Sequence, residues 1–527
     1  MLHRPYPPPP SPSPPDGVFL TRRSDTEWQF KDEKPHDPAH FFPTLRVGDL
    51  TLCMNRPAGI EAEYEGLSLG DARLQRRALA IVERVISGPA QSFPQLLPTS
   101  AELEGAYRFF QNDAVSASDL LNPHLQASLA RARQDRTVRI VHDTTAMSFG
   151  GSRDGCGTLG GGGSGFWAQM ALAVSAGEER VPLGVVGLET MVYPTLEEKK
   201  KDFQNRLRRF RREKLRTFPS ASIVWPGLEK WSTIPLRLRD ALKGVRVIHV
   251  MDREADNFEL MSLLKKQKMH FVVRGSSARS VGCAGQEEVR VENALAKAEI
   301  VLRRRVRLTA RPKQIGDHPQ RQERDATLSL RAARVTLKST AGGRLSLNVV
   351  EAFERRPPSD EEPINWVLFT TEPIDTAEQV GAVVDHYRAR WRIEEYFKAL
   401  KTGCSIEKRQ LTTYEGLKRA LALFIPVAWH LMALRTAAHQ EEPTPAASVL
   451  TPLQLTILRA LAIERQVDLS NSPTAREAML ALAALGGHLK RNGDPGWLTL
   501  ARGYERLRYA ESIWLLARDS TERRDQS

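Results

Sequence analysis

The sequence is poor in cysteine and has no long apolar run. Its four cysteines, Cys53, Cys156, Cys283 and Cys404, are scattered and form no C-x-x-C pair. This spacing supports neither a disulfide framework nor a thiolate zinc site, and it suits a reducing cytoplasm. No stretch approaches the roughly 20 apolar residues that a membrane helix needs, and the N-terminus lacks the apolar core of a signal peptide. We therefore expect no membrane partner.

Acidic residues are also in short supply. The chain has 63 Asp and Glu against 76 Lys and Arg, which gives a formal net charge of +13. Such a balance favours an anionic partner, and nucleic acid is the commonest large one, although a basic protein that is merely soluble is the alternative. A length of 527 residues exceeds what one hydrophobic core usually supports, so we expect two to four domains.

The N-terminal part divides into a tail and a helical region. Residues 1–53 begin with "HRPYPPPPSPSPPDG", which lacks backbone donors and predicts an extended Pro-rich disordered tail. Translation starting at Met54 rather than Met1 is an alternative, because the globular pattern begins only after it. Residues 54–122 show helical periodicity, with one apolar stripe formed by Leu74, Ala78, Ile81, Val82 and Val85. This pattern predicts a small, basic helical domain.

The rest of the chain predicts an α/β fold with a β-rich insertion. Residues 123–270 alternate strands and helices, and "FWAQMALAVSA" and "VPLGVVGLETMVY" read as neighbouring strands. Residues 271–372 alternate in period two, residues 373–440 become helical from about Thr376, and residues 441–527 are helical again. The Arg-rich segment 198–216 is helical or flexible, and either contacts DNA backbone or is a solvated basic insertion.

Two aspartates follow apolar strand patterns. Asp143 closes "VRIVHD" and Asp252 closes "VRVIHVMD". Functional side chains gather at the carboxyl ends of strands in α/β sheets, so these two carboxylates are expected to meet although they are far apart in sequence. The alternative is that each one caps a turn or a helix, since "DTT" and "DREAD" both suit that purpose.

The segment "HYRARWRIEEYFKALKTG" places a carboxylate among cations. Tyr387, Arg390, Glu394 and Lys401 fall on one stripe of a continuous helix, whereas Glu395 points about 100° away. Such a stripe suits a carboxylate that holds a metal beside cations and a phenol that hold phosphate oxygens. A ladder of solvated salt bridges is the alternative, although the neighbouring aromatic residues demand burial or a stacking partner.

Asp143, Asp252 and Glu394 together predict a metal site. Three carboxylates can hold two Mg²⁺ ions about 3.5–4 Å apart for an in-line phosphoryl transfer. Ligands that are only hard oxygens, without His or Cys, favour magnesium, with manganese able to substitute, over zinc.

These motifs resemble the insertion-sequence-four (IS-four) family of DDE transposases, and "RWRIEEYFKALKTG" is especially similar to the transposon-five type. The spacing Y-x2-R-x3-E-x6-K of Tyr387, Arg390, Glu394 and Lys401 is the family's signature. "HDTT" and "VMDREADNFE" resemble its two aspartate motifs, and "LGDARLQRR" and "EGAYRFFQN" resemble its DNA-binding domain. The resemblance runs from about residue 61 to 518. The Pro-rich tail, "GTLGGGGSG" and segment 198–216 depart from it.

The resemblance implies roles for domains and residues. Residues 54–122 would bind DNA, 123–270 and 373–440 would form an RNase H-like catalytic core around the insertion 271–372, and 441–527 would dimerise. The catalytic and metal-binding residues would be Asp143, Asp252 and Glu394. The DNA contacts would come from Tyr387, Arg390, Lys401, Trp366, Arg274, Arg392 and Trp391. Trp366 would stack on a flipped base, with burial in the core as its alternative.

The implied activity is cut-and-paste transposition. Relatives bind terminal inverted repeats, cleave the ends through a hairpin and join them to target DNA as a homodimer, which predicts a bacterial cytoplasmic, nucleoid-associated enzyme. The apolar stripe of Leu507, Ala510, Trp514 and Ala517 either forms the dimer contact or packs within its own subunit. A domesticated or inactive DNA-binding protein and a stand-alone Mg²⁺ nuclease are the alternative functions.

Overall fold

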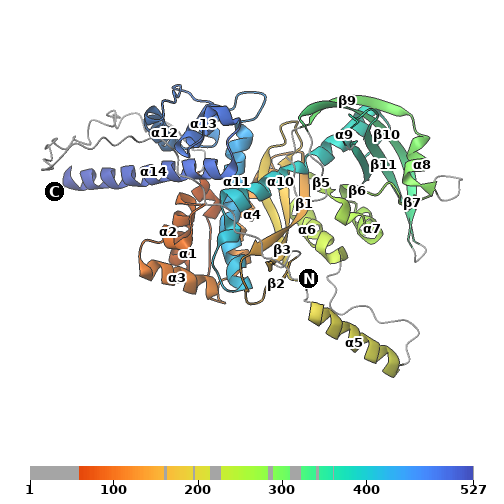
Figure 1. Ribbon diagram of the computed structural model, residues 1–527, viewed down its shortest axis with the longest axis horizontal. Helices are drawn as coiled ribbons and strands as arrows, with labels where there is room; N and C mark the ends of the chain where they lie inside the picture. Colours follow the sequence, from red (N-terminus) through yellow and green to blue (C-terminus); the bar gives the residue numbers. More distant parts are fainter. Residues whose placement is uncertain are drawn as a thin grey trace, which may run out of the picture. The chain divides into compact units, whose positions relative to one another are not determined.

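The computed structural model describes residues 59–159, 163–193, 196–213, 227–282, 289–308, 322–339, 343–359, 361 and 363–525. The predicted tail 1–53 and the middle of the glycine-rich loop lie outside these ranges. The fold is a mixed α/β structure with helical regions at both ends of the described chain, which confirms the α/β class (Figure 1).

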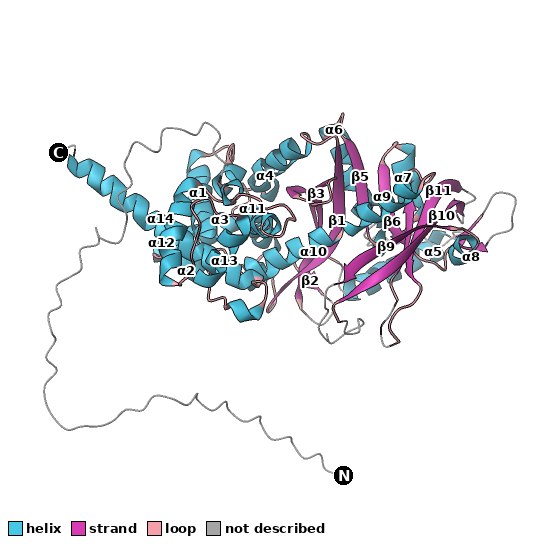
Figure 2. Ribbon diagram, turned by 90° about the horizontal axis from the view of Figure 1, so that it is seen from above, coloured by secondary structure: helices cyan, strands magenta, loops and turns pink. Residues whose placement is uncertain are grey.

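Within the described ranges, ten of the twelve strands form one mixed sheet in the order β2-β3-β1-β5-β6-β12-β11-β10-β9, with β4 paired to β3 (Figure 2). The strands are β1 (Thr137–Phe149), β2 (Gly157–Thr158), β3 (Ser164–Ser175), β4 (Pro182–Met191), β5 (Arg246–Met251), β6 (His270–Gly275), β7 (Ser280–Val281), β8 (Val289–Arg290), β9 (Ile300–Leu308), β10 (Arg324–Lys338), β11 (Arg344–Glu354) and β12 (Asn365–Thr370). β3 and β4 are antiparallel neighbours, as predicted.

The longer helices come in three groups along the chain. Before and between the first strands lie α1 (Ala72–Ser87), α2 (Phe93–Leu96), α3 (Ser100–Gln111), α4 (Ala117–Ala132), α5 (Leu196–Glu213) and α6 (Gly227–Ala241). Beside the later strands lie α7 (Phe258–Lys266), α8 (Val291–Ala296), α9 (Ala377–Arg388) and α10 (Trp391–Lys398). The C-terminal part contains α11 (Tyr414–Ala437), α12 (Pro452–Glu464), α13 (Ala475–Leu485) and α14 (Trp497–Asp525).

Short helical turns connect these elements. They are η3 (Ile60–Tyr64), η4 (Arg253–Ala255), the π-helical η5 (Ala399–Gly403), η6 (Ile406–Lys408), η7 (Ala446–Ser448) and η8 (Lys490–Asn492).

The sheet is covered on both faces. Alternate residues of a strand point to opposite faces, and on β6 Val272 joins the apolar cluster that includes α9, whereas Phe271 and Val273 join the cluster formed with α6, α7 and α8. The same sheet continues from the strand pair β5–β6 into the β-rich segment, because β12 is hydrogen-bonded to β6. The expected boundary between residues 270 and 271 thus falls at the start of a strand that bonds to both parts, and the domain division stays a prediction.

The N-terminal helices share a core with the C-terminal ones. The predicted stripe of α1 is confirmed, since Ala78, Ile81, Val82 and Val85 are buried. They belong to a cluster that also contains residues of α11, α13 and α14. Buried Arg419 on α11 ties the two regions together, because it donates to the carbonyl oxygens of Phe110 and Val115.

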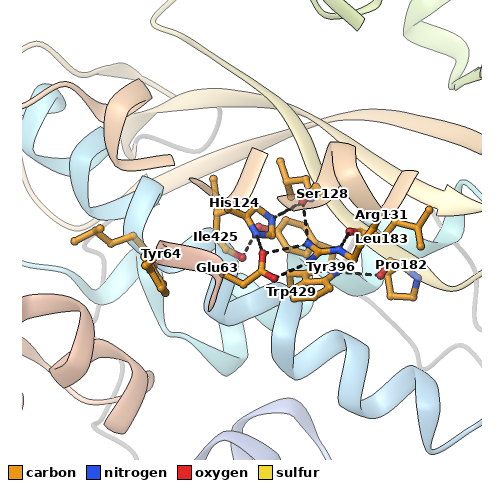
Figure 3. A network of polar contacts seen from close by, with 12 residues as sticks. Glu63, Tyr64, His124, Ser128, Arg131, Pro182, Leu183, Tyr396, Ile425 and Trp429 are labelled. Atoms are coloured by element: carbon orange, nitrogen blue, oxygen red, sulfur yellow. Dashed lines mark hydrogen bonds and ion pairs between the residues drawn. The ribbon is translucent and has the colours of Figure 1, made fainter. Parts of the chain in front are cut away.

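A buried polar network fastens the first residues of the described chain to the sheet (Figure 3). Glu63 on η3 accepts from His124 Nδ1 at 2.6 Å and from Arg131 at 2.7 Å. Arg131 also donates to the Leu183 carbonyl at 2.6 Å, and His124 Nε2 accepts from the Val185 amide at 3.1 Å. Both contacts with β4 are made to backbone groups, so the network fixes η3 and α4 against the edge of the sheet.

The expectation that no stretch is long and apolar enough to cross a membrane is wrong for one helix. α11 is long and apolar enough to cross a membrane, but 78% of its apolar window is buried inside the fold. Such burial is typical of a core helix, and α11 packs against α3, α4 and β4.

Candidate active site

Asp143 lies on β1, and Asp252 directly follows β5, the parallel neighbour of β1. β1 and β5 are paired with a constant offset of 109 positions, the last pair being Val141 with Val250. The same offset relates Asp143 to Asp252, two positions further along. The parallel pairing therefore brings together the two carboxylates that the sequence patterns singled out.

The two aspartates differ in their local setting. Asp252 follows the end of β5, caps η4 and accepts a hydrogen bond from the Glu254 amide at 2.9 Å, so the capping interpretation is also correct there. The sequence suggested that Asp143 closes its strand, but it does not. β1 continues to Phe149, because its second half still pairs with β3, where Asp143 lies opposite Met170.

The expected continuous helix around Glu394 is also wrong. α9 ends at Arg388 and α10 begins at Trp391, with a tight turn in which the Arg390 amide bonds to the Tyr387 carbonyl at 2.9 Å. After Lys398 the backbone widens into the π-helical η5, which carries Lys401. The four signature residues thus come from three consecutive segments, and their directions are set by the turns between them.

Arg390 links two of the three carboxylates. Its guanidinium donates to Asp143 at 2.9 Å and also pairs with Glu394 in the next turn. Burial is the largest cause that raises the pKa of Asp143, to about 6, and the charges of Asp252 and Glu394 add to it while Arg390 opposes them. Burial likewise raises the pKa of Asp252. The ion pair with Arg390 is therefore too weak to offset burial and the neighbouring negative charges.

The carboxylates are near each other but do not converge on one point. Within the described ranges, no three Asp, Glu, His or Cys side chains are grouped so that they could hold a metal ion. The guanidinium of Arg390 lies between Asp143 and Glu394 instead.

Tyr387 forms a second cluster beside the carboxylates. Its ring is buried and meets the half-buried Trp366 of β12 edge to face, with ring centroids 5.3 Å apart. Burial raises the pKa of Tyr387. The charge of Arg390 and a hydrogen bond from Arg274 of β6 act in the opposite direction and are outweighed. Arg274 lies opposite Leu368 of β12, so the sheet places Trp366, Arg274 and Tyr387 together.

Lys401 lies beside the same strand as Asp143. Its ammonium donates to the carbonyl oxygen of Ala146, and it pairs with Glu407 at 3.2 Å. Glu407 also accepts from the Ser148 amide at 2.9 Å. Lys401 is thus held three residues beyond Asp143 along β1.

Arg392 and Trp391 are not part of this group of contacts. Arg392 pairs with Glu395 at 2.8 Å and donates to the Glu179 carbonyl at 3.0 Å. Glu395 is therefore a partner of a neighbouring base, apart from the contacts of Glu394. Trp391 is 54% exposed, and Lys398 lies 5.9 Å from its ring centroid.

Sequence reasoning missed two histidines behind the aspartates. His142 and His249 are buried and hydrogen-bonded to each other at 2.9 Å. Burial lowers the pKa of His142 well below its usual range and that of His249 to about 3, so both rings are uncharged at neutral pH. Each one stands in a quoted strand motif, but only the pairing of β1 with β5 shows that they touch.

Two family models match this chain. Residues 58–115 match the model described as transposase DNA-binding, and residues 233–425 match the transposase DDE domain. The second range contains Asp252 and Glu394 together with Tyr387, Arg390 and Lys401, whereas Asp143 precedes it.

A solved structure is also similar: the piggyBac transposase synaptic complex with hairpin DNA, at 9% sequence identity, with 77% of each chain covered and a TM-score of 0.32. At this TM-score no conclusion about the present chain is drawn from it. The two family matches support a DDE transposase, in which a transposase DNA-binding region precedes a DDE domain that implies an RNase H-like core.

Proposed function

We propose that this chain is a cut-and-paste DNA transposase of the IS-four family, transposon-five type. It binds terminal inverted repeats, cleaves the transposon ends through a hairpin intermediate and joins them to target DNA. The observation that carries the proposal is that Asp143 on β1 and Asp252 just after β5 stand at corresponding positions of two parallel neighbouring strands, with Glu394 joined to Asp143 through Arg390. The matches to a transposase DNA-binding model and a DDE model support it independently.

The donor set fits a hard divalent cation. Asp143, Asp252 and Glu394 offer only carboxylate oxygens, which Mg²⁺ and Mn²⁺ prefer. The raised pKa of Asp143 and Asp252 reflects buried negative charge that a cation would stabilise. Asp143, Asp252 and Glu394 would hold such an ion, which would supply activation of a water or 3′-hydroxyl and stabilisation of the leaving oxygen of the phosphodiester.

Arg390 pairs with Asp143 and Glu394 in the structure described here. Its five N–H donors match phosphate oxygens equally well, so in the DNA complex it exchanges a carboxylate partner for the scissile phosphate. Its position between Asp143 and Glu394 supports a phosphate site beside these two carboxylates.

The remaining signature residues hold the DNA end. The Tyr387 hydroxyl, positioned by Arg274, donates to a phosphate oxygen, and Lys401 supplies a charge further along β1. The part of Trp366 that Tyr387 does not cover stacks on a base at the transposon terminus, worth about 1–3 kcal/mol. Trp391 is 54% exposed, and the proposal assigns it and Arg392 to DNA contacts outside this cluster.

The active form is a homodimer on DNA in the bacterial cytoplasm, associated with the nucleoid. The apolar stripe predicted for dimerisation packs largely inside its own subunit: Leu507 is buried, and Ala510 and Trp514 pack on the core. The dimer contact is instead assigned to a second stripe of α14, which leaves Tyr509, Ile513 and Leu516 exposed.

Cleavage of linear DNA that carries the element's terminal repeats tests the function. Wild-type protein with Mg²⁺ should release the ends, and Glu394→Gln should bind the same DNA but cut it at least about 10³-fold more slowly, because it removes one carboxylate of the catalytic set. Glu395→Gln is the matched control, since the adjacent carboxylate pairs with Arg392. Equal cutting by wild type and Glu394→Gln would refute the assignment, and wild-type binding without cutting would favour an inactive, transposase-derived protein.

A further inference from the structure

α5 is a strongly basic helix whose described side chains are almost all exposed. Its 18 residues, Leu196–Glu213, include eight Lys and Arg against four Asp and Glu. Figure 1 shows it as one continuous helix. The exposed basic side chains in it are Lys200, Lys201, Arg208, Arg209, Arg211 and Arg212. The sequence did not decide whether segment 198–216, which overlaps α5, contacts DNA or is a solvated insertion.

Most of these charges share one side of α5. At 100° per residue, Lys200, Lys201, Arg208, Arg211 and Arg212 lie within an arc of about 120°, spread over about 18 Å of helix. Arg209 and Arg212 share the single carboxylate of Glu213, at 3.0 Å each.

The other basic residues of the arc keep their charge available. In the part of the chain that the structure describes, Lys200, Lys201, Arg208 and Arg211 form no ion pair with a carboxylate. A row of uncompensated cations held on one helix favours a polyanion over a single small anion.

The chain connects α5 to the sheet end that carries the candidate active site. Asp143 on β1 lies opposite Met170 on β3, and Met170 lies opposite Leu188 on β4. The start of α5 lies eight positions after Leu188, so the chain reaches at most about 28 Å between them. The first turn of α5 therefore lies within about one helical turn of DNA of Leu188, which is in the same cross-strand row as Asp143.

We propose that α5 binds the phosphate backbone of the target DNA duplex. This inference rests on the proposed transposase function. Target DNA has no fixed sequence, so it must be held through phosphates, and the exposed basic side chains of α5 supply charge without a fixed base partner. The terminal repeats, in contrast, have a fixed sequence, and the region 58–115 matches a transposase DNA-binding model.

Binding to random-sequence duplex DNA tests the charge arc without requiring catalysis. The variant Lys200→Ala/Lys201→Ala/Arg208→Ala/Arg211→Ala keeps helix-forming residues, so its circular dichroism should match wild type. Its affinity at 0.1 M salt should fall about tenfold or more, and the slope of log K against log salt should decrease by about 3–4, because each phosphate contact contributes about 0.9.

The control removes four exposed basic residues from other elements. Lys266→Ala/Arg303→Ala/Arg355→Ala/Arg356→Ala lowers the net charge equally. This control should change the slope by less than about 1, because its residues form no single arc. Equal slopes for both variants would overturn the proposal, since the effect would then follow net charge alone.

Strand transfer identifies which DNA α5 holds. The α5 variant should bind and cleave uncut terminal-repeat DNA as wild type does. With pre-cleaved terminal-repeat DNA and a separate target duplex, it should join the ends to target about tenfold less. Loss of end binding or end cleavage in parallel would assign α5 to the transposon end and overturn the proposal. Wild-type strand transfer by the variant would overturn it as well. If wild-type protein neither cuts nor joins, the proposed function fails, whereas the salt slope on random duplex still reports on α5 as a DNA contact.

Discussion

Two buried carboxylates show how single residues acquire opposite properties. Asp143 has its pKa raised to about 6, because burial and the charges of Asp252 and Glu394 outweigh Arg390. Burial also raises the pKa of Glu63, but hydrogen bonds from His124 and Arg131 outweigh it and lower that pKa to about 2. Burial lowers the pKa of His124, so at neutral pH Arg131 supplies the positive charge beside Glu63. The negative charge around Asp143 is not offset by Arg390, which suits a site for cations. The charge of Glu63 is offset by its hydrogen bonds, which suits a structural role.

Glu63→Gln should lower the free energy of unfolding at pH 7 by about 2–3 kcal/mol, since hydrogen bonds to charged groups contribute about 1.5–3 kcal/mol. The folded-state pKa of Glu63 lies below its usual 4.5, so its stabilisation is fully present above pH 4.5 and is lost as pH falls through about 2. Urea unfolding of variant and wild type at pH 7, 5 and 3 should show the difference shrinking toward low pH.

Glu65→Gln provides the control for this prediction, because Glu65 is exposed two residues away. It should change stability by less than about 0.5 kcal/mol at each pH. A stability difference for Glu63→Gln that stays constant from pH 7 to pH 3 would contradict the assignment of a charged Glu63.

At the scale of elements, backbone turns set where the signature residues point. The stripe of Tyr387, Arg390, Glu394 and Lys401 requires a continuous helix, but the chain tightens before α10 and widens in η5. Tyr387 consequently packs against Trp366, while Arg390 and Glu394 meet Asp143. Because the chain changes direction between α9 and α10, the aromatic pair and the charged group lie on two neighbouring surfaces.

The crossing of α13 and α14 depends on two glycines. A methyl group at Gly503 would overlap the Leu482 carbonyl oxygen, and one at Gly486 would overlap the Thr499 carbonyl oxygen. Because backbone atoms cannot yield as a side chain can, Gly503→Ala should destabilise the protein by about 1–3 kcal/mol, measured as a lower midpoint of urea unfolding.

Gly177→Ala is the comparison, since a methyl group there would meet nothing within 4 Å and its backbone conformation suits other residues. It should leave the midpoint unchanged or raise it slightly. A neutral Gly503→Ala would mean that the two helices separate at no cost.

At the scale of the whole molecule, the unpacked apolar surface of α14 is the most specific indication of assembly. Tyr509, Ile513 and Leu516 are 68%, 49% and 71% exposed and follow one another at helical spacing. A contiguous apolar stripe of this kind favours a partner surface.

If the proposed homodimer forms through this stripe, wild type should assemble two chains with two ends, and the double variant Ile513→Glu/Leu516→Glu should bind terminal-repeat DNA as one chain per end. Charged side chains on this stripe would be buried without partners in the dimer, which costs several kcal/mol. Sedimentation of the DNA complexes measures the stoichiometry.

Ile463→Glu/Leu489→Glu is the matched control, because both residues are exposed and apolar but lie outside α14. It should assemble as wild type does. Two chains in the complex of the α14 variant would exclude this stripe as the contact.

Much of the fold could be predicted from local patterns. The apolar stripe of α1 and the strand pair β3–β4 follow from periodicity, which local backbone geometry produces directly. The continuation of β1 beyond Asp143 could not be predicted, because pairing with β3 sustains a strand through polar residues. The fate of the α14 stripe could not be predicted either, since periodicity identifies an apolar face without naming what covers it.

The sequence by itself determined which residues are the candidates for the chemistry: Asp143, Asp252 and Glu394 among basic and aromatic neighbours. Their types and spacing are local properties of the chain, and they can be read without coordinates. Only the tertiary structure decided that Asp143 faces Asp252, that Arg390 lies between Asp143 and Glu394, and that Arg392 belongs to Glu395. These contacts depend on strand register and on turns between helices, and both are set by packing between segments far apart in the sequence.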